Sequence, residues 1–589
     1  MSIDNLITDH IETWTTAHVQ KKSGGRGRSK KSNSQSQYGV KKLRELILDL
    51  AVRGKLIPQS SNDEPASVLL KKVSNDRTRL VREGKIKKQK PAPTIHESEL
   101  PFQIPRGWQW ERFPNVCDYS PGKTPSTKNP VYWPDDSTGI PWVCISDMTH
   151  NEKVTSTQKR ISQAAVDQVF KRVAIKSGSL LMSFKLTVGK ISTLAMDAYH
   201  NEAIISIKPF DCVSQEYISW FLPTRALAGN TKSVLMGDTL NATSLSQILL
   251  PIPPLAEQHR IVAKVDELMA LCDQLEQEQT DNTETHQLLV KTLLDSLTHV
   301  TDHEDFISTW KMIEHNFDLL FTTEASIDEL KQTILQLAVM GKLVPQDTND
   351  EPASELLKKI AAEKARLVKT GKIKTQKVLP EISEDEKPFE LPNGWEWVGF
   401  NNLIHPEYPI GYGVLVPGPD IKGGIPLVRI ADLSIKKPLS QPGKSIAPEI
   451  DQNFKRTRLN GGEILMGVVG SIGKLGIAPD SWRGANIARA ICRIIPNQFI
   501  NKDYLIWLLQ SEFMQRGFVG GTRTLAQPTL NISLIRIALT PLPPLNQQLR
   551  IVAKVEELMN LCDSLKDHIY QAQAIQVQLA VVVVDQARF

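Results

Sequence analysis

Apolar residues recur at helical spacing in two short segments that lie far apart in the chain. They are Leu43, Leu46, Ile47, Leu50 and Ala51 in the first segment, and Leu330, Ile334, Leu337 and Ala338 in the second. Steps of three and four residues place these side chains on one face of an α-helix. Gly54 and Gly341 follow, where a helix is expected to end. We therefore predict two amphipathic helices, each ended by a glycine.

A heptad pattern predicts a long helix after each of two Pro-Pro pairs, at residues 253–254 and 543–544. Its apolar positions are Ile261, Val265, Leu268, Cys272 and Leu275 in the first helix, and Ile551, Val555, Leu558, Cys562 and Leu565 in the second. Steps of four and three residues are typical of a coiled-coil contact face. About 40 helical residues would extend roughly 60 Å. We expect both cysteines to be small buried core residues.

These helical segments belong to a duplicated half-molecule. Gly-Lys-Leu-Ile-Pro-Gln at 54–59 returns as Gly-Lys-Leu-Val-Pro-Gln at 341–346, and residues 43–113 align without a gap on 330–400. Arg-Ile-Val-Ala-Lys-Val at 260–265 returns unchanged at 550–555. Two copies with so long a period indicate an internal duplication, because solenoid proteins repeat shorter units more often.

Between the helical segments lie two regions rich in aromatic, β-branched, Gly and Pro residues, which predict short strands and turns. The sequences of these two regions differ between the copies far more than those of the helical segments do. Within the first region, a helix is expected at 215–222. The predicted fold class is mixed α/β, with two tandem globular domains separated by long antiparallel coiled-coil-like helices. The chain begins with one kind of helical segment and ends with the other. If the two ends meet, they complete a second spacer and give a pseudo-twofold circular arrangement.

Composition is that of an ordinary soluble protein, with 23% charged and 41% hydrophobic residues. No apolar run approaches the roughly 18 residues of a membrane span, and the first residues show no signal-peptide pattern. The six cysteines never approach CxxC spacing, which indicates reduced thiols. We therefore expect a cytoplasmic protein with no membrane partner.

Positive charge is concentrated near the start of the chain. Residues 41–90 hold 14 Lys and Arg against 6 Asp and Glu. Residues 21–31 are a Gly, Ser, Lys and Arg stretch too poor in apolar residues to fold. We therefore expect a flexible basic arm over residues 1–40. It could follow a phosphate backbone without reading bases, or it could be a solvated tether.

No catalytic or metal-binding motif is complete. Val-Gly-Lys-Ile at 188–191 and Ile-Gly-Lys-Leu at 472–475 resemble part of a P-loop, but Ile or Leu replaces the hydroxyl residue that would reach Mg²⁺. Asn-Pro-Val-Tyr at 129–132 lacks the second proline of the Asn-Pro-Pro-Tyr loop of amino-methyltransferases. The 12 histidines form no HExxH motif and no Cys/His cluster, so no metal site is predicted.

The two variable regions instead offer loop residues suited to double-stranded DNA. Arg and Lys suit guanine edges, and Ser, Thr and Lys suit phosphate oxygens. The candidate DNA-binding residues are Lys123, Thr124, Lys128, Trp142, Ser146, Lys185, Lys190, Arg429, Ser471, Lys474, Arg489, Thr522 and Arg523. Taken alone, each is also typical of a plain surface position, and it is the set on paired domains that favours DNA. Trp108, Trp110, Trp395 and Trp397 are expected to pack where helix meets domain.

The doubled order of these motifs resembles the specificity subunit of type I restriction–modification systems. The matching features are the Gly-Lys-Leu-(Ile/Val)-Pro-Gln segments, Leu-Pro-x-Gly-Trp-x-Trp at 391–397, and Pro-(Ile/Leu)-Pro-Pro-Leu followed by Arg-Ile-Val-Ala-Lys-Val. The first copy has Ile104 in place of Leu. The second reads Gln547-Gln548 where the family more often shows Glu-Gln, as at 257–258. The resemblance covers the chain except residues 1–40.

This resemblance implies a non-catalytic, DNA-binding host-defence subunit that binds no cofactor itself. Each of two target-recognition domains would read one half of an asymmetric bipartite DNA site. The helices would set the spacing and dock two methyltransferase subunits and, through them, restriction subunits. S-adenosylmethionine, ATP and Mg²⁺ would belong to those partners. The expected parts are a basic arm (1–40), a helical region (41–104), recognition domain 1 (105–255), a central helical spacer (256–391), recognition domain 2 (392–545) and a C-terminal long helix (546–589).

Two other classes of protein remain open at the level of sequence. A stand-alone two-headed DNA-binding regulator would share the layout, but the outer faces of its helices would need no partner. A self-sufficient DNA adenine methyltransferase would need a cofactor loop and an intact Asn-Pro-Pro-Tyr motif, and both are missing.

Overall fold

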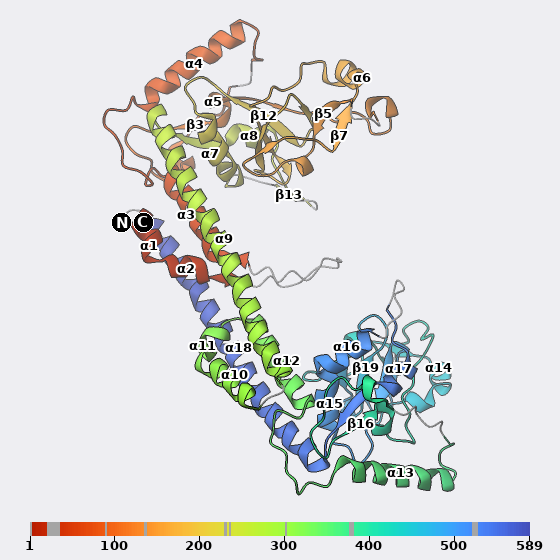
Figure 1. Cartoon of the computed structure of the whole chain (residues 1–589). Helices are drawn as coiled ribbons and strands as arrows, with labels where there is room; N and C mark the ends of the chain where they lie inside the picture. Colours follow the sequence, from red (N-terminus) through yellow and green to blue (C-terminus); the bar gives the residue numbers. More distant parts are fainter. Residues whose placement is uncertain are drawn as a thin grey trace. The chain divides into compact units, whose positions relative to one another are not determined.

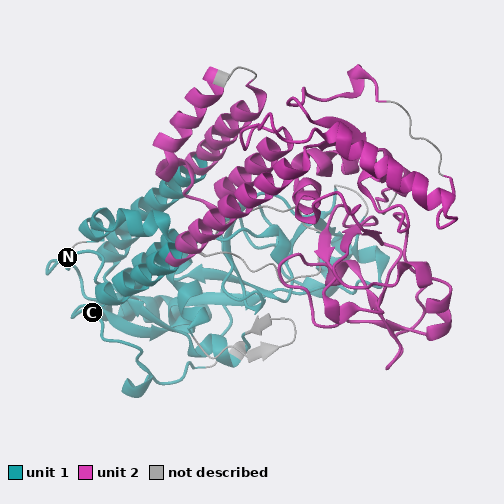
Figure 2. Ribbon diagram, turned by 90° about the horizontal axis from the view of Figure 1, so that it is seen from below, with its two compact units in different colours: residues 1–281, 572–589 teal, residues 282–571 magenta. Residues whose placement is uncertain are grey.

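The computed structural model describes residues 3–19, 36–88, 91–134, 138–228, 232–234, 237–300, 303–375, 382–520 and 528–588. The chain forms two compact units, one of residues 1–281 with 572–589 and the other of residues 282–571 (Figure 2). Each unit combines helices with small sheets (Figure 1). The helices α9 (Leu255–His299) and α18 (Leu545–Arg588) each contribute residues to both units. The predicted mixed α/β class with two tandem domains and long helices is confirmed.

The helical part of the first unit contains both ends of the chain. Its helices are α1 (Ile3–Asp9), α2 (Ile11–Thr16), α3 (Tyr38–Val52), α4 (Ala66–Arg82), the first part of α9 and the last turns of α18. Lys55 Nζ donates a hydrogen bond to the carbonyl of Arg588 (2.8 Å), and the Arg588 guanidinium pairs with Asp49 (3.2 Å). The predicted meeting of the first and last helical segments is therefore present within this unit.

The second unit repeats this arrangement with the end of α9 in place of the end of α18. Its helices are α10 (His303–His315), α11 (Phe317–Leu320), α12 (Glu324–Val339), α13 (Ala353–Lys369), the last turns of α9 and most of α18. Lys342 Nζ donates to the carbonyl of Val300 (2.6 Å), as Lys55 does to that of Arg588. The repeated Gly-Lys motif thus holds the carbonyl end of a long helix in both units.

The predicted amphipathic helices are α3 and α12, and their apolar faces lie in the cores of their units. Gly54 and Gly341 end them with φ angles of +68° and +72°. A Cβ atom at these glycines would lie 2.3 and 2.5 Å from the ring of Pro105 and of Pro392. Each glycine is therefore required both by its left-handed backbone and by the close approach of the globular domain.

The heptad positions of the long helices are also where the sequence predicts them. All five positions of α9 are buried, as are Ile551, Val555 and Cys562 of α18. Leu558 and Leu565 are partly buried against the same core. Cys272 and Cys562 are free and buried, and burial raises the pKa of both thiols, that of Cys272 to about 11. They are core residues, as predicted.

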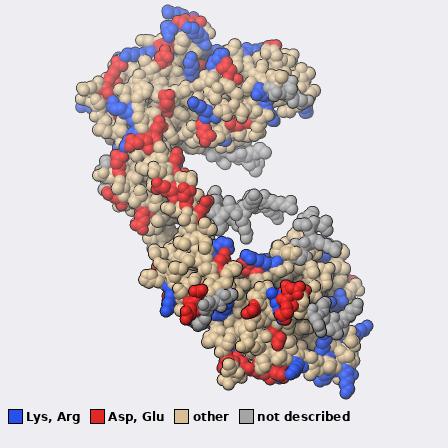
Figure 3. Space-filling model, viewed as in Figure 1, with Lys and Arg blue, Asp and Glu red and all other residues tan. Residues whose placement is uncertain are grey.

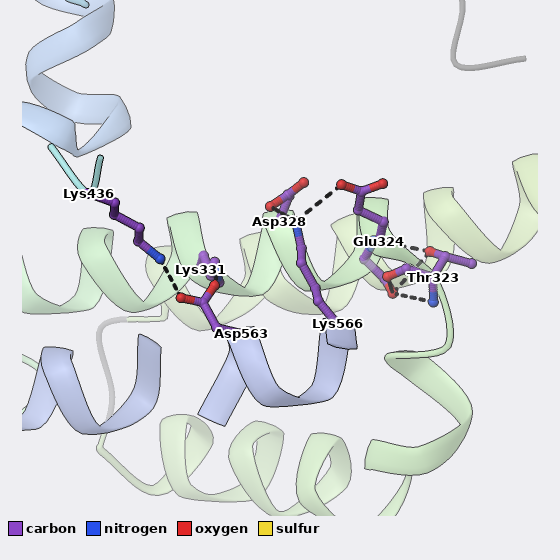
Figure 4. A network of polar contacts seen from close by, with 8 residues as sticks. Thr323, Glu324, Asp328, Lys331, Lys436, Asp563 and Lys566 are labelled. Carbon is purple, nitrogen blue, oxygen red and sulfur yellow. Dashed lines mark hydrogen bonds and ion pairs between the residues drawn. The ribbon is translucent and has the colours of Figure 1, made fainter. Parts of the chain in front are cut away.

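Charged pairs join each long helix to its neighbour. In the first unit Arg44 of α3 contacts Asp273 of α9 at 2.6 Å. The equivalent pair in the second unit is Lys331 of α12 with Asp563 of α18 (Figure 4). Lys436, from the globular domain, contacts the same carboxylate. Burial alone would raise the pKa of Asp563, but hydrogen bonds from the two lysines outweigh it and lower that pKa.

The globular domain of the first unit contains several small sheets. Its strands are β3 (Gln109–Arg112), β4 (Cys117–Pro121), β5 (Ile140–Val143), β6 (Glu152–Val154), β7 (Lys159–Ile161), β8 (Leu180–Ser183), β9 (Lys185–Leu186), β10 (Ile191–Leu194), β11 (Tyr199–His200), β12 (Ile204–Pro209), β13 (Lys232–Val234), β14 (Gly237–Thr239) and β15 (Leu249–Ile252). They pair in the orders β4-β12-β8-β10-β6, β11-β5-β7, β13-β14-β9 and β15-β3. Its helices include α5 (Phe113–Val116), α7 (Gln215–Leu227) and α8 (Ala242–Gln247). Of these, α7 confirms the helix predicted at 215–222.

The globular domain of the second unit repeats the central parts of this plan. Its strands are β16 (Glu396–Gly399), β17 (Ile425–Val428), β18 (Ser445–Ile446), β19 (Ile464–Gly467), β20 (Leu475–Ile477), β21 (Asn486–Ile487), β22 (Ile491–Ile494) and β23 (Leu539–Leu542), paired as β16-β23, β18-β17-β21 and β20-β19-β22. Its helices include α14 (Pro448–Gln452), α15 (Lys502–Gln510), α16 (Glu512–Gly520) and α17 (Ile532–Ile537). The two domains therefore share a framework although their sequences have diverged.

The first and last strands of each domain pair with each other and close it beside the helices. β3 pairs antiparallel with β15, and β16 with β23. Trp108 Nε1 donates to Glu257 at the start of α9, and Trp395 Nε1 donates to Gln547 at the start of α18, both at 2.9 Å. The predicted role of these tryptophans as packing residues between helix and domain is confirmed.

Residues 1–40 differ from the flexible arm expected from the sequence. Residues 3–16 fold into α1 and α2, which bury Ile3, Leu6, Ile7 and Trp14 in the core of the first unit. Strands β1 (His18–Val19) and β2 (Ser36–Gln37) pair antiparallel beyond them. The buried apolar side chains explain the difference, since they favour a packed segment. The basic residues 21–31 lie outside the described residues.

Candidate nucleic-acid interface

In both globular domains a strand whose last two residues are buried runs into a single turn of 3₁₀ helix whose residues approach the surface. Strand β5 leads into η3 (Ile145–Asp147), and β17 leads into η7 (Ile430–Asp432). Asp147 accepts a hydrogen bond from the backbone N–H of Cys144, and Asp432 accepts one from that of Arg429, both at 2.8 Å. The carboxylates thus cap the turn, and the turn holds Ser146 in one domain and Arg429 in the other at exposed positions.

A hairpin lies against this turn in each domain. In the first, β8 and β10 are joined by a tip in which Gly189 has a φ of +84°; in the second, β19 and β20 are joined by a tip in which Gly473 has a φ of +76°. The next residue is lysine in both. Lys190 Nζ donates to the carbonyl of Ile145 (3.1 Å), and Lys474 Nζ donates to that of Ile430 (2.8 Å). The lysine therefore fixes the hairpin tip to the 3₁₀ turn.

These contacts bring several predicted residues together. Ser146 and Lys190 lie on one pair of linked loops, with Lys185 on the same hairpin tip. Arg429 and Lys474 lie on the equivalent pair, with exposed Ser471 on that tip. A lysine ammonium has three donor hydrogens, so the bond to the turn leaves others available. Exposed Lys474 and half-buried Lys190 can therefore still donate to a phosphate or a base edge.

In the second domain, strand pairing brings Arg489 to the same end of the sheet as Arg429. Strands β17 and β21 are parallel, with Val428 opposite Ile487, and the N–H of Ala488 donates to the Val428 carbonyl (3.0 Å). Arg429 and Arg489 thus follow the carboxyl ends of two neighbouring strands, and both are exposed. Two guanidinium groups at one sheet edge suit bidentate recognition of guanine or contact with phosphate. Thr522 and Arg523 lie outside the described residues.

The loop at 122–129 in the first domain presents Lys123, Thr124 and Lys128 at exposed positions. Lys123 Nζ donates to the carbonyl of Val169 (2.7 Å). Trp142, predicted as a DNA contact, is only 4% exposed, and its Nε1 donates to the carbonyl of Lys123 (3.0 Å). The structure therefore places Trp142 as an internal support of this loop. The sequence did not reveal this, since the tryptophan's partner is a backbone atom 19 residues away.

The long helix α9 as a whole has the opposite charge. This helix carries nine Asp and Glu against three Lys and Arg. Acidic side chains gather over the helical region that contains α9, on the face of the molecule shown in Figure 3. Such a face repels phosphate, so DNA contacts are favoured on the domain loops rather than on this helix.

The described residues offer no candidate for a metal site or a membrane span. Its residues contain no group of three or more His, Cys, Asp or Glu side chains that could hold a metal ion. No helix within the described ranges is long and apolar enough to cross a membrane. The paired loops themselves offer hydrogen-bond donors and positive charge, from Lys190 in the first domain and from Arg429, Lys474 and Arg489 in the second.

Comparison with known proteins gives a consistent result. The family of the type I restriction modification DNA specificity domain matches residues 105–284 and 420–572. The chain is 37% identical to the type I restriction enzyme EcoAI specificity subunit of Escherichia coli, and 36% identical to the EcoEI specificity subunit of the same species. Both alignments cover 100% of this chain and 100% of the relative. Among solved structures, the HsdS subunit from Thermoanaerobacter tengcongensis matches with 16% identity and a TM-score of 0.35, over 83% of this chain and 98% of that one.

Proposed function

Because this chain belongs to the family of type I restriction–modification specificity subunits, which are non-catalytic parts of their complexes, we propose that each of its two globular domains reads one half of an asymmetric bipartite DNA site. The family assignment also removes the adenine methyltransferase alternative. The observation that supports two-part reading is the duplicated pair of linked loops, with one 3₁₀ turn and one hairpin tip in each domain.

The two reading surfaces differ in chemistry, which supports an asymmetric site. The first carries Ser146, Lys185 and Lys190, with Lys123, Thr124 and Lys128 on a nearby loop. The second carries Arg429, Ser471, Lys474 and Arg489. Lysine and serine suit phosphate and single acceptors, whereas paired arginines suit bidentate contact with guanine. Equivalent backbones with different side chains would read different bases.

The helices would hold the partner subunits. The acidic surface of α9 favours a protein partner over a second DNA contact, since it repels phosphate. We propose two methyltransferase subunits as these partners, with restriction subunits recruited through them in the cytoplasm. S-adenosylmethionine, ATP and Mg²⁺ would be bound by the partners. The domain boundaries at 104/105, 255/256, 391/392 and 545/546 would separate the two globular domains that read DNA from the helices that bind the partner subunits.

This proposal is tested by reconstituting the chain with and without its methyltransferase subunit. Pull-down should recover both subunits together, and methyl transfer from S-adenosylmethionine to a bipartite DNA motif should require both. The chain alone should show no transfer. Methylation by the purified chain alone, or a complete complex that methylates a single undivided motif, would contradict the proposal.

A further inference from the structure

An exposed leucine at the tip of the first hairpin has a left-handed backbone. Leu186 has a φ of +69°, and 51% of its surface is exposed. A side chain in this conformation brings its Cβ close to the following carbonyl, which is why glycine and asparagine usually occupy it. The other non-glycine residues with positive φ in the described ranges are Asn151, Lys171 and Cys212. Leu186 alone among these four is a large, exposed apolar residue.

The second domain has glycine at the equivalent position. Counting from the hairpin glycines Gly189 and Gly473, Leu186 corresponds to Gly470, whose φ is +78°. A Cβ atom built on Gly470 would have no atom within 4 Å. This turn therefore needs a left-handed residue but sets no demand on its side chain. The second domain uses the residue with the least strain, and the first uses leucine.

The backbone pairing of its strand does not explain this choice. Half of Leu186 faces solvent, and its strand β9 pairs with β14 through backbone groups that any residue would supply. A strained residue whose side chain points outward is typical of a functional position rather than of a stabilising one.

The surroundings of Leu186 favour DNA as its partner. Within the hairpin tip, residues 183–190 contain two lysines and no carboxylate, and the residue paired with Leu186 across the sheet is Asp238 of β14. Lys185 lies on one side with its ammonium 5.3 Å from the Phe184 ring, and Lys190 binds the neighbouring 3₁₀ turn. An apolar side chain between cations can contact a thymine methyl group or a base step while the cations contact phosphates.

We propose that Leu186 is an apolar DNA contact of the first domain and determines the base preference at one position of its half-site. This inference rests on the proposed function. The leucine would be retained despite its backbone strain because its side chain contacts a base that Gly470 cannot reach in the other half-site.

The test uses the full chain assembled with its methyltransferase subunits and a duplex carrying the motif that the wild-type complex methylates. Leu186→Gly should melt at the same or a higher temperature, because it relieves strain, yet its Kd for this duplex should rise roughly tenfold. Discrimination should weaken at one position of the first half-site only. Leu186→Ala should weaken binding similarly. The control is Leu439→Ala in the second domain, where the leucine is 52% exposed, and it should leave binding unchanged.

The outcomes separate this inference from the function on which it rests. If the wild-type complex methylates no bipartite motif, the proposed function fails. If it does, but both Leu186 variants keep wild-type Kd and base discrimination, the leucine is not a DNA contact. Weaker pull-down of the methyltransferase subunit by Leu186→Gly, with unchanged DNA binding by the complexes that form, would assign the leucine to a protein interface and overturn the inference.

Discussion

Gln258 and Gln548 link helix and domain in the same way in both halves of the chain. The side-chain oxygen accepts a hydrogen bond from the backbone N–H of Ser214 (2.8 Å) or Asn501 (2.9 Å). The side-chain nitrogen donates to the carbonyl of Pro253 (2.9 Å) or of the equivalent proline (3.0 Å). Both glutamines are fully buried. The departure from the family motif at Gln547 therefore leaves in place the second glutamine, Gln548, which makes these contacts.

Replacing either glutamine with alanine should destabilise its unit. Gln258→Ala leaves a buried N–H and a buried carbonyl without partners, which costs roughly 2–4 kcal/mol. Gln548→Ala should cost a similar amount. The matched control is Gln274→Ala on an exposed position of the same long helix, expected to change stability by less than about 0.5 kcal/mol. Urea unfolding measures all three, and equal losses for Gln258→Ala and Gln274→Ala would contradict the assigned role.

His200 makes the first domain sensitive to acid. It is fully buried in strand β11, its Nδ1 lies 3.2 Å from the Asn201 carbonyl, and its Nε2 has no hydrogen-bond partner in the described structure. Burial lowers its pKa from 6.5 to about 4. The unfolded chain therefore binds a proton between pH 6.5 and 4 that the folded chain does not. Stability should fall across this window as the pH falls, by on the order of 2–3 kcal/mol.

The variant His200→Gln isolates this effect, because glutamine cannot bind the proton. It should flatten the loss of stability between pH 6.5 and 4, measured as melting temperature against pH. His259→Gln, at an exposed position of α9, serves as the control and should keep the wild-type slope. An unchanged slope in His200→Gln would show that other groups cause the acid sensitivity.

At the scale of elements, the sequence predicted the helices well because a helix depends on near neighbours. The faces of α3 and α12, their terminal glycines and the heptads of α9 and α18 all follow from spacings of three and four residues. The strand pairings could not be predicted, since β6 pairs with β10 about 40 residues later. The link between Lys190 and the Ile145 carbonyl depends on the same long-range pairing. Ile3, Leu6 and Ile7 did carry a helical signal, which the neighbouring lysine-rich stretch obscured.

The long helices provide a test of spacing. An insertion after His299 would not extend α9, because the helix ends there and α10 and α11 follow as separate helices. Seven residues added within α9 after Asp281 and within α18 after Gln571 would keep each heptad in phase. They would lengthen each helix by about 10.5 Å, close to three base pairs.

Methylome sequencing of this double-insertion variant should show a gap about three base pairs wider with unchanged half-site bases. Insertion into only one helix is the control and should impair folding or activity, because the two helices would no longer match. An unchanged gap with full activity would show that α9 and α18 do not set the spacing.

At the scale of the whole molecule, the duplication supports the proposal that one chain specifies two different sequences. Helical contacts such as Lys55 with Arg588 and Lys342 with Val300 are the same in both units, whereas the loops at the reading surfaces differ. The shared helices and strands position the 3₁₀ turn and the hairpin tip in each domain, but they do not determine which side chains these loops carry. The division between an unchanging framework and variable loops could be predicted from the sequence. The contact made by each loop residue could not, since Trp142 supports a loop from inside while its neighbours are exposed.

The most direct test of the account exchanges one recognition domain. Residues 105–250 are replaced by the corresponding domain of a relative with a different target, and the methylated motif is read by methylome sequencing in cells that express the methyltransferase subunit. We predict that one half of the motif changes to the relative's half, while the other half and the gap stay the same. A change in both halves, or a motif that does not change, would contradict the claim that each domain reads one half-site independently.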